Sequence, residues 1–340
     1  MAPLADYTDL PFRESMRRQG AKFLFTQMID SGALVWSRRS KKSLAERNQK
    51  TITRGKSEPW LGVQLLGNVP EILKEAVEIL NEQEFDVLDL NMGCPMKKVT
   101  KRGCGAAMCD DSDLAQWSLE TLVKTSRFPV TAKTRIISHD DIEANVKWAK
   151  QLESTGIQAL TIHGRERSAI YAGEPAFDSL KAIADALDIQ VIANGGIMSA
   201  SRSLEMSEKS GIDCQMVARG AIGNPWIFRE LQTDFLAKVS LLEQAGKSVP
   251  KFAPSSDQIC QEMQLNFKDM IDFHGEEVAC RVSRKLILAF LKGRGYSSKF
   301  RDRVGRLNSS QEYFELFGEV ASQGASPDYL ESVTLYNQFI

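Results

Sequence analysis

An amide and a thiol stand three residues apart in the motif Asn91-Met92-Gly93-Cys94-Pro95, and such a pair could take part in proton transfer. The motif follows an apolar run, residues 85–90, that predicts a short buried strand. Glycine and proline after the strand predict a tight turn, so the strand would deliver both side chains into one loop. A free thiol with a pKa of about 8.5 is mostly protonated at neutral pH and can act as an acid. For the motif alone, an incidental cysteine in a strand–helix loop is an equally good explanation.

Other residues capable of chemistry also stand where predicted strands end. Lys133 could stabilise negative charge that develops during a reaction, and His163 could donate a hydrogen bond to a phosphate or a ring oxygen. Gln64 offers donors and an acceptor to a heteroaromatic ring. Each has a structural alternative: a salt bridge for Lys133, a buried structural hydrogen bond for His163 and a hydrogen bond at the mouth of a barrel for Gln64. The full set comprises Ala2, Pro3, Leu4, Gln64, Asn91, Cys94, Lys133, Arg135, His163, Asn194, Gly195, Gly196, Ala218, Arg219 and Gly220.

Two glycine-containing loops, Asn194-Gly195-Gly196 and Ala218-Arg219-Gly220, follow the seventh and eighth predicted strands. Loops at this position of a β/α barrel often bind phosphate through backbone amides and a nearby helix N-terminus. Glycine lets the backbone approach an anion closely, although tight turns alone would also require it. The pair of loops therefore indicates a phosphate site more strongly than either loop would.

The elements that must position these residues form a regular alternation of short apolar runs and amphipathic segments. Eight strand–helix units over about 240 residues predict a (β/α)8 TIM barrel, in which chemistry takes place at the carboxyl ends of the strands. A doubly wound open sheet is the alternative, but no Gly-x-Gly-x-x-Gly follows the first strand. The predicted strands are 1–4, 22–28, 61–66, 85–90, 129–135, 159–163, 190–194 and 213–218. Helices are predicted to open at Thr8 and to span 70–83, 113–125, 141–154, 177–187, 200–209 and 225–235.

The bulk composition is that of an ordinary globular protein, with 43% hydrophobic and 26% charged residues over 340 positions. No apolar run reaches the length of about 18 residues that a membrane span needs, and the first residues lack the pattern of a signal peptide. None of the six cysteines forms a Cys-x-x-Cys pair, so we expect neither a zinc site nor a redox motif. Reduced thiols and a cytoplasmic location are the expectation.

The end of the chain differs from the barrel in texture and charge. Residues 239–255 predict a linker, and Ser255 with Gln258 resembles the capping box of a following helix. Residues 256–340 predict a small helical domain, with two or three further helices up to about Val320. Residues 281–306 hold nine basic residues and one acidic residue, a net charge of +8, so the rest of the chain carries −9 of the total of −1. Such a run is either a solvated helix face or a surface that contacts phosphates.

Together these motifs resemble the tRNA-dihydrouridine synthase family, most closely its B-type bacterial branch. The resemblance runs in order through nearly the whole barrel and extends to the basic helical tail. It rests on the stretch from Met1 to Arg13, Gln64-Leu65-Leu66-Gly67, Asn91-Met92-Gly93-Cys94-Pro95 with Lys97-Lys98-Val99, Lys133-Thr134-Arg135, His163-Gly164-Arg165, Asn194-Gly195-Gly196 and Asn224-Pro225-Trp226-Ile227-Phe228.

The resemblance implies an FMN enzyme that uses NADPH to reduce the C5=C6 bond of uridine in tRNA. It implies hydride transfer from the reduced flavin to C6, proton donation from Cys94 to C5, and a uridine that leaves the RNA stack. By family analogy FMN is held by Ala2, Pro3, Leu4, Gln64, Lys133, His163, Asn194, Gly195, Gly196, Ala218 and Arg219. The substrate contacts implied are Asn91, Arg135 and Tyr171 for the uridine, and Arg281, Arg284 and Lys285 in the tail.

The resemblance further implies an FMN-binding barrel over 1–238, a linker over 239–255 and a tRNA-binding helical domain over 256–340. It implies a monomer in the cytoplasm, with no metal and no membrane contact. Leu4 and Ala218 depart from the methionine and glycine usual in the family, and the first strand looks short. Two other functions stay open: an FMN barrel acting on a free small molecule such as dihydroorotate, and a non-catalytic RNA-binding protein. The sequence does not specify which uridine is modified, nor does it decide between tRNA and ribosomal RNA as the target.

Overall fold

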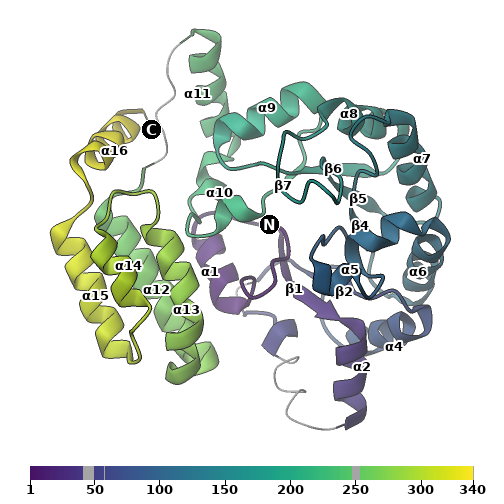
Figure 1. The fold of residues 1–340 in the computed structure, drawn as a ribbon, viewed down its shortest axis with the longest axis horizontal. Coiled ribbons are helices and arrows are strands. Elements are labelled where there is room, and N and C mark those ends of the chain that lie inside the picture. The colour runs from purple at the N-terminus through teal and green to yellow at the C-terminus, as the bar shows by residue number, and fades with distance from the viewer. Residues whose placement is uncertain (41–49, 57, 247–252, 340) are drawn as a thin grey trace. The chain divides into compact units, whose positions relative to one another are not determined.

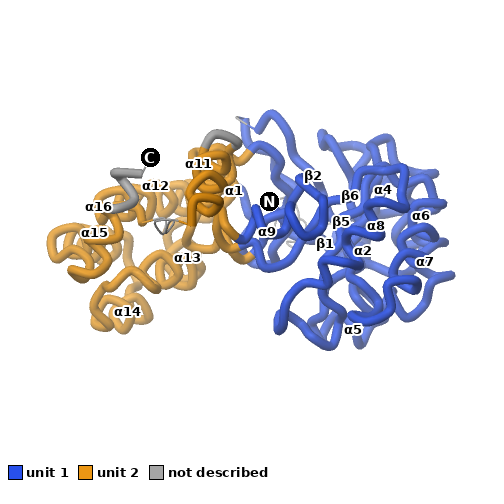
Figure 2. Tube along the Cα trace, turned by 90° about the horizontal axis from the view of Figure 1, so that it is seen from above, with its two compact units in different colours: residues 1–10, 22–197, 202–218 blue, residues 11–21, 198–201, 219–340 orange. Residues whose placement is uncertain are grey.

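The computed structural model describes residues 1–340 except 41–49, 57, 247–252 and 340. The chain divides into two compact units (Figure 2). The first comprises Met1–Leu10, Lys22–Ile197 and Arg202–Ala218, and the second comprises Pro11–Ala21, Met198–Ser201 and Arg219–Ile340. The predicted boundaries at 238 and 255 stay a prediction. The helix that follows Thr8 groups with the second unit, which no sequence feature had indicated.

The first unit is built on one sheet in which the described residues form seven parallel strands, paired in chain order. Its strands correspond to the second to eighth predicted strands. Three of them have the predicted bounds, three are shifted at their ends by one or two residues, and the last is much shorter than predicted. The strands are β1 (Leu24–Asp30), β2 (Leu61–Leu66), β3 (Val87–Met92), β4 (Val130–Arg135), β5 (Ala159–His163), β6 (Gln190–Asn194) and β7 (Gln215–Met216).

The predicted first strand, residues 1–4, is not a regular strand, although it occupies the eighth place of the barrel. The Met1 amino group donates to Phe23 O at 2.8 Å, next to β1, and Ala2 N donates to Val217 O at 2.7 Å, just after β7. Pro3 has no N–H for a ladder hydrogen bond, so the segment cannot pair regularly over its short length. The segment thus bridges the two edge strands and closes a TIM barrel, confirming the predicted fold class.

Helices surround the sheet (Figure 1), and two of them begin at an aspartate that accepts from a free N–H group of the first turn. Asp111 accepts from Leu114 N at 3.0 Å, Asp141 accepts from Ala144 N at 2.9 Å, and Pro70 opens its helix. These helices agree with the prediction within about three residues, except the first, which was not predicted. They are α2 (Ser31–Ser40), α4 (Pro70–Leu80), α6 (Ser112–Thr125), α7 (Ile142–Glu153), α8 (Phe177–Ala186) and α9 (Ala200–Ser210).

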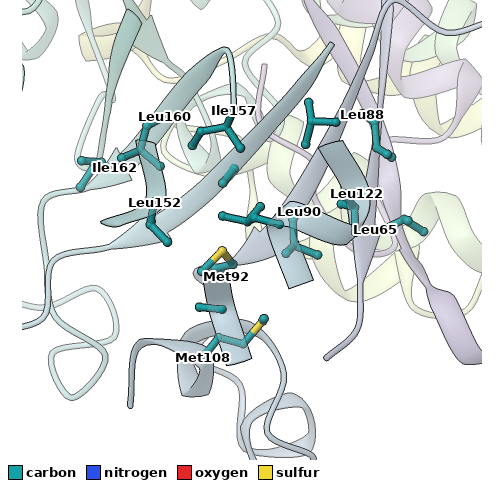
Figure 3. Close-up of a cluster of buried hydrophobic side chains, with 14 of the residues drawn as sticks. Leu65, Leu88, Leu90, Met92, Met108, Leu122, Leu152, Ile157, Leu160 and Ile162 are labelled. Atoms are coloured by element: carbon teal, nitrogen blue, oxygen red, sulfur yellow. The ribbon is translucent and has the colours of Figure 1, made fainter. Parts of the chain in front are cut away.

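The main core lies between the outer face of the sheet and these helices (Figure 3). Leu88, Leu90 and Met92 alternate along β3 and pack toward Leu122 of α6 and other buried side chains. Because side chains of a strand alternate between faces, Asp89 and Asn91 point the opposite way, into the barrel. The apolar outer face therefore fixes which residues form the polar interior.

The second unit is helical, and its aromatic core joins α12 (Ser256–His274) to α15 (Ser310–Gln323). Phe267 stacks on Tyr313 with ring centroids 4.3 Å apart. The predicted capping box is confirmed: Gln258 N donates to Ser255 Oγ at 3.2 Å, and Ser255 N donates to Gln258 Oε1 at 2.9 Å. The remaining helices are α1 (Leu10–Arg18), α10 (Ile227–Glu230), α11 (Thr233–Gln244), α13 (Glu276–Leu291), α14 (Ser298–Val304) and α16 (Pro327–Phe339).

Helix α1 joins this unit through buried polar contacts with α12. Ser15 Oγ and Arg18 Nη2 donate to Glu262 Oε1 at 2.7 and 2.8 Å, and Asn266 Nδ2 donates to Pro11 O at 3.1 Å. These partners lie about 250 positions apart in the chain, which is why local patterns do not reveal them.

Three tail features differ from the expectation. The helix predicted over 225–235 is broken into α10 and α11, and α11 extends into the segment predicted as a linker. Helix α16 was not predicted, and residues 247–252 of the linker lie outside the described residues. Among the helices that the structure describes, none is long and apolar enough to cross a membrane.

Candidate active site

Polar side chains from β2 to β6 meet at the carboxyl edge of the sheet. The register pairs Gln64 with Asp89, Asn91 with Lys133, and His163 with Asn194. The first two pairs belong to the inner set defined by the alternation of β3, because the neighbouring residues Leu65, Leu90 and Ala132 all belong to the core outside the barrel. The structure thus brings together, on adjacent strands, the residues that the sequence predicted at strand ends.

The loop that carries Cys94 is held on three sides. Asn91 Oδ1 accepts from Gly93 N at 3.2 Å and from Cys94 N at 3.0 Å. Arg135 Nε donates to Gly93 O at 2.8 Å, and Ala106 N donates to Cys94 O at 3.0 Å. Cys94 itself is half-buried. The loop therefore presents the thiol from a fixed backbone.

Glycine at two points allows this close packing. A Cβ on Gly93 would lie 3.3 Å from both Lys133 O and Thr134 O, on β4. A Cβ on Gly105, whose φ is +61°, would lie 2.8 Å from Cys94 O. Larger side chains at either position would push the cysteine loop away from the sheet.

An acidic residue that sequence reasoning missed, Asp89, lies below this loop with 2% of its surface exposed. Gln64 Nε2 donates to Asp89 Oδ2 at 2.7 Å, and Thr131 Oγ1 donates to Asp89 Oδ1 at 2.6 Å. Burial raises the pKa of Asp89 to about 6, although both hydrogen bonds and the Lys133 charge oppose the rise. A charged residue inside the apolar run 85–90 that precedes Asn91 was the signal that could have revealed it.

Lys133 is the cation of this interior. Burial and the nearby Arg135 charge lower the pKa of Lys133 to about 8, while the Asp89 and Cys94 charges act in the opposite direction. An incompletely solvated cation has a strong field, because the low local dielectric screens it poorly. Lys133 can therefore stabilise negative charge that forms near the strand ends.

The glycine pair after β6 is surrounded by basic side chains. Gly195 and Gly196 have φ values of +127° and +76°. A Cβ on Gly195 would lie 3.2 Å from Arg165 Nη1 and 3.4 Å from His163 Nε2, and one on Gly196 would lie 3.5 Å from Arg202 Nη2. Backbone free of side chains next to three cationic or donor groups is suited to a phosphate.

Neither Arg165 nor Arg202 was among the predicted cofactor residues. Arg165 donates through Nε and Nη2 to Gly173 O at 2.9 and 2.7 Å, which fixes its guanidinium plane. Arg202 pairs with Glu174 and Glu205. The His163-Gly164-Arg165 motif contained a signal for the first, whereas Arg202 stands on a helix with no motif.

The remaining predicted cofactor residues come from the segments that close the barrel. Ala2 and Met216 belong to one buried cluster, against which Ala218 packs. Leu4 N donates to Thr8 Oγ1 at 3.0 Å, and Asn194 Nδ2 donates to Met216 O at 2.6 Å. Pro3 lies between Ala2 and Leu4, and Arg219 follows Ala218 as the first residue of that stretch of the second unit.

The residues predicted to contact uridine make contacts within the protein. Asn91 uses both amide atoms, and it also donates to Met28 Sδ at 3.4 Å. Arg135 Nη1 donates to Glu166 O at 3.1 Å, and its Cζ lies 5.9 Å from the ring centroid of Tyr171. Tyr171 is 42% exposed. Direct contact of these residues with uridine stays a prediction.

The predicted tail contacts differ in how they are used. Arg281 is exposed, whereas Arg284 Nη2 donates to Leu307 O at 2.8 Å and to Asn308 Oδ1 at 3.0 Å. Lys285 is half-buried and Arg294 is buried, with its Cζ 5.6 Å from the centroid of the Trp226 ring. The exposed cations of the basic segment are Arg281, Lys292, Lys299, Arg301 and Arg306.

Comparison with known proteins identifies the family of this chain. A family model described as "Dihydrouridine synthase (Dus)" matches residues 1–324. The "tRNA-dihydrouridine synthase B" of Pasteurella multocida is 34% identical over 313 residues, which cover 92% of this chain and 89% of that protein. The protein of the same name from Pseudomonas aeruginosa is 33% identical over 310 residues, which cover 91% of this chain and 88% of that protein.

Among solved structures, an amine oxidase from Pseudomonas geniculata N1 that acts on 6-hydroxypseudooxynicotine aligns with a TM-score of 0.50 and 10% identity, covering 70% of this chain and 47% of that one. Similarity at this level concerns the fold alone. The family match over nearly all of the sequence, together with relatives of 33–34% identity, shows that this chain belongs to the dihydrouridine synthase family.

Proposed function

We propose that this chain reduces the C5=C6 bond of specific uridines in tRNA to 5,6-dihydrouridine, with FMN as the bound cofactor and NADPH as the reductant. The relatives named tRNA-dihydrouridine synthase B support tRNA as the substrate. One observation carries the proposal most: a cysteine on an anchored loop stands at the same strand ends as a half-buried cation, Lys133, and a glycine cradle lined by basic groups.

The residues present fit FMN. A phosphate would fit the backbone of Gly195 and Gly196, beside His163 and Arg165, where a Cβ would have filled the space. Gln64 would supply a remaining N–H to the isoalloxazine ring, and Lys133 would supply the positive charge beside it. The proposed set also includes Ala2, Pro3, Leu4, Asn194, Ala218 and Arg219.

When bound, reduced FMN supplies a hydride for C6 of the uracil ring. Lys133 favours the accumulation of negative charge at the strand ends, because it is a poorly solvated cation. Cys94 donates its Sγ proton to C5 and is later reprotonated from solvent. Asn91 and Arg135 hold the backbone on both sides of the thiol, so the proton is delivered from a fixed position.

Two groups of exposed cations suit an RNA substrate. Lys97, Lys98 and Lys101 are exposed on the residues that follow Cys94, around the short helix α5 (Lys97–Thr100). They can contact phosphates on either side of a uridine that has left the stack. In the tail we assign the phosphate contacts to Arg281 and the other exposed cations, with Lys285 at the margin and Arg284 mainly supporting the fold.

The proposal covers the organisation of the chain as well. A barrel over 1–238 would bind FMN, and helices over 256–340 would contact tRNA after the linker 239–255. The enzyme would act as a monomer in the cytoplasm, where its six free cysteines stay reduced.

The test is the dihydrouridine content of total tRNA and rRNA, measured by mass spectrometry in a strain lacking this gene, in its parent, and in the deletion strain complemented with wild type or Cys94→Ala. We expect loss at defined tRNA positions that wild type restores and Cys94→Ala does not. Loss confined to rRNA would keep the reaction and replace the substrate. Unchanged dihydrouridine in both RNAs would contradict the proposal and favour a small-molecule substrate or a binding role.

A further inference from the structure

Asp89 is a buried charged residue at the strand ends to which the proposed function gives no part. It lies inside the barrel on β3 with 2% of its surface exposed, and both carboxylate oxygens accept hydrogen bonds, from Gln64 and Thr131. Lys133 is the charged group that faces it. Burying a carboxylate destabilises the folded state unless hydrogen bonds and a nearby cation compensate, so a carboxylate at this position calls for a specific role.

A chain of hydrogen bonds connects Asp89 to the cysteine loop, and every bond in it has the same direction. Cys94 N donates to Asn91 Oδ1 at 3.0 Å, Asn91 Nδ2 donates to Gln64 Oε1 at 2.7 Å, and Gln64 Nε2 donates to Asp89 Oδ2 at 2.7 Å. Two side-chain amides thus link a backbone N–H to a carboxylate.

The two ends of this hydrogen-bond chain, the Asp89 carboxylate and the backbone N–H groups of the cysteine loop, determine how the amides are oriented. An ionised carboxylate only accepts hydrogen bonds, so Gln64 must turn its NH2 group toward Asp89 and its oxygen toward Asn91. Asn91 must then turn its NH2 group toward Gln64, which leaves its oxygen for Gly93 and Cys94. A single flipped amide would put two donors face to face and leave a buried group unsatisfied.

We propose that Asp89 is a positioning residue, whose carboxylate sets the orientation of the Gln64 and Asn91 amides and thereby holds the Cys94 loop in place. The consequence for proton donation rests on the proposed function, whereas the loop geometry does not. The orientation also leaves Gln64 one N–H beyond the one that it donates to Asp89, and this N–H can be offered to a ligand.

The test compares Asp89→Asn, Thr131→Val and the double variant in the full chain without added FMN. In Asp89→Asn the introduced amide could keep its oxygen toward Gln64 by donating to Thr131, so the charge is lost but the orientation is only weakened. Thr131→Val keeps the carboxylate and serves as the matched control. In the double variant the introduced NH2 group has lost its partner Thr131, so it is free to turn toward Gln64 and bond to Oε1. Gln64 and Asn91 would then have to flip, which conflicts with the N–H groups of the cysteine loop at the other end of the hydrogen-bond chain.

The readout is the iodoacetamide alkylation rate of Cys94 relative to Cys214, measured by peptide mass spectrometry at pH 7. Cys214 is exposed and outside the hydrogen-bond chain, so it corrects for reagent and pH. We expect increases of less than twofold for Thr131→Val, about threefold for Asp89→Asn and about tenfold for the double variant, as for loss of a hydrogen bond. Loss of the Asp89 charge also changes the electrostatics around the thiol, both directly and through Lys133. The comparison is therefore repeated at the high-pH plateau of the alkylation rate, where thiol ionisation no longer contributes, and a faster rate there reports loop release.

Cys94 labelling at the wild-type rate in folded Asp89→Asn and double variants would overturn the proposal; thermal melting establishes that they are folded. If the double variant does not fold, Asp89→Asn alone decides. Hydrogen–deuterium exchange of the peptide containing Gly93 and Cys94 provides a second measure, which must rise with the alkylation rate. Because neither readout uses flavin or RNA, a failure here is distinct from a failure of the proposed function, which FMN binding and dihydrouridine formation test.

Discussion

The strand ends of the barrel and the basic segment 281–306 are both rich in polar groups, but they use them differently. At the strand ends, Gln64, Asp89 and Asn91 bond to one another and to the backbone. In the basic segment, Arg284 and Arg294 are held by the protein, whereas five other cations face solvent. The side chains at the strand ends therefore hold one another in fixed positions, whereas the basic segment presents positive charge to solvent.

The difference follows from the two kinds of backbone. A strand alternates its side chains strictly, so an apolar outer face forces the remaining residues into the barrel. The turn between α13 and α14 does not impose this alternation on its side chains. A basic residue there can therefore be buried within the second unit, as Arg294 is. We therefore expect substitutions at the strand ends to change chemistry and cofactor binding, and substitutions in the basic segment to change RNA affinity.

The largest effect is expected for Cys94→Ala. Removing a general acid lowers a rate by about 100- to 10,000-fold, so dihydrouridine formation in tRNA should fall by that order. FMN binding and NADPH oxidation should persist, because the loop backbone is held by Asn91 and Arg135. Cys214→Ala, at an exposed thiol, is the control and should behave as wild type. Dihydrouridine formed by Cys94→Ala at the normal rate would remove Cys94 from the mechanism.

The next effect concerns the glycine cradle. Gly195→Ala adds a Cβ 3.2 Å from Arg165 Nη1 in a left-handed backbone, so the dissociation constant of FMN should rise at least about tenfold. Gly211→Ala is the matched control, since Gly211 has a φ of +70° but nothing within 4 Å of a Cβ. Flavin fluorescence titration of the apo-protein measures both. Equal affinities for the two variants would show that the space beside Gly195 is not part of the FMN site.

Much of the barrel was predictable because its signals are local. The strands β2, β5 and β6 have the predicted bounds, since short apolar runs ended by turn residues define them without tertiary information. The motif around Cys94 also marked the site. The short β7 and the irregular residues 1–4 were less predictable, because their role depends on closing the barrel rather than on their own propensity.

The parts of the site that were missed depend on contacts between distant residues. Asp89 acquires its partners from β2 and β4, and Arg202 reaches the glycine loop from a helix without a motif. The hydrogen bonds of Arg284 come from the turn before α15, more than 20 positions further along the chain. A charge count treats such an arginine like its exposed neighbours.

A smaller effect is expected in the basic segment. We expect weaker tRNA binding, by up to about tenfold, in the triple variant Lys299→Gln, Arg301→Gln and Arg306→Gln. Its binding should also depend less on salt concentration, because the variant contacts fewer phosphates and binding therefore releases fewer counterions. Its thermal stability should stay close to that of wild type.

Arg284→Met is the contrasting variant: it should lower the melting temperature, because Leu307 O and Asn308 lose a donor. Filter binding at several salt concentrations and thermal melting measure these outcomes. If Arg284→Met lost RNA affinity without loss of stability, the contrast between held and exposed cations would fail.

An effect on stability rather than on function is expected at the buried charge, and its dependence on pH tests it. The pKa of Asp89 is raised from 3.8 to about 6 in the folded protein, so the folded state keeps a proton that the unfolded state releases across this range. Wild type should therefore lose stability relative to Asp89→Asn as the pH rises from about 4 to 6, by about 1–3 kcal/mol, and the difference should level off above that. Lys133, the facing cation, stays protonated there because its pKa is about 8. Urea denaturation at pH 4.5, 5.5 and 7 measures the difference. Thr131→Val retains the carboxylate but loses a hydrogen bond that lowers the pKa of Asp89, so its stability should fall with rising pH at least as much as that of wild type. Parallel curves for wild type and Asp89→Asn would mean that Asp89 is solvated in the folded protein, and a carboxylate solvated in that way could not dictate the orientation of Gln64.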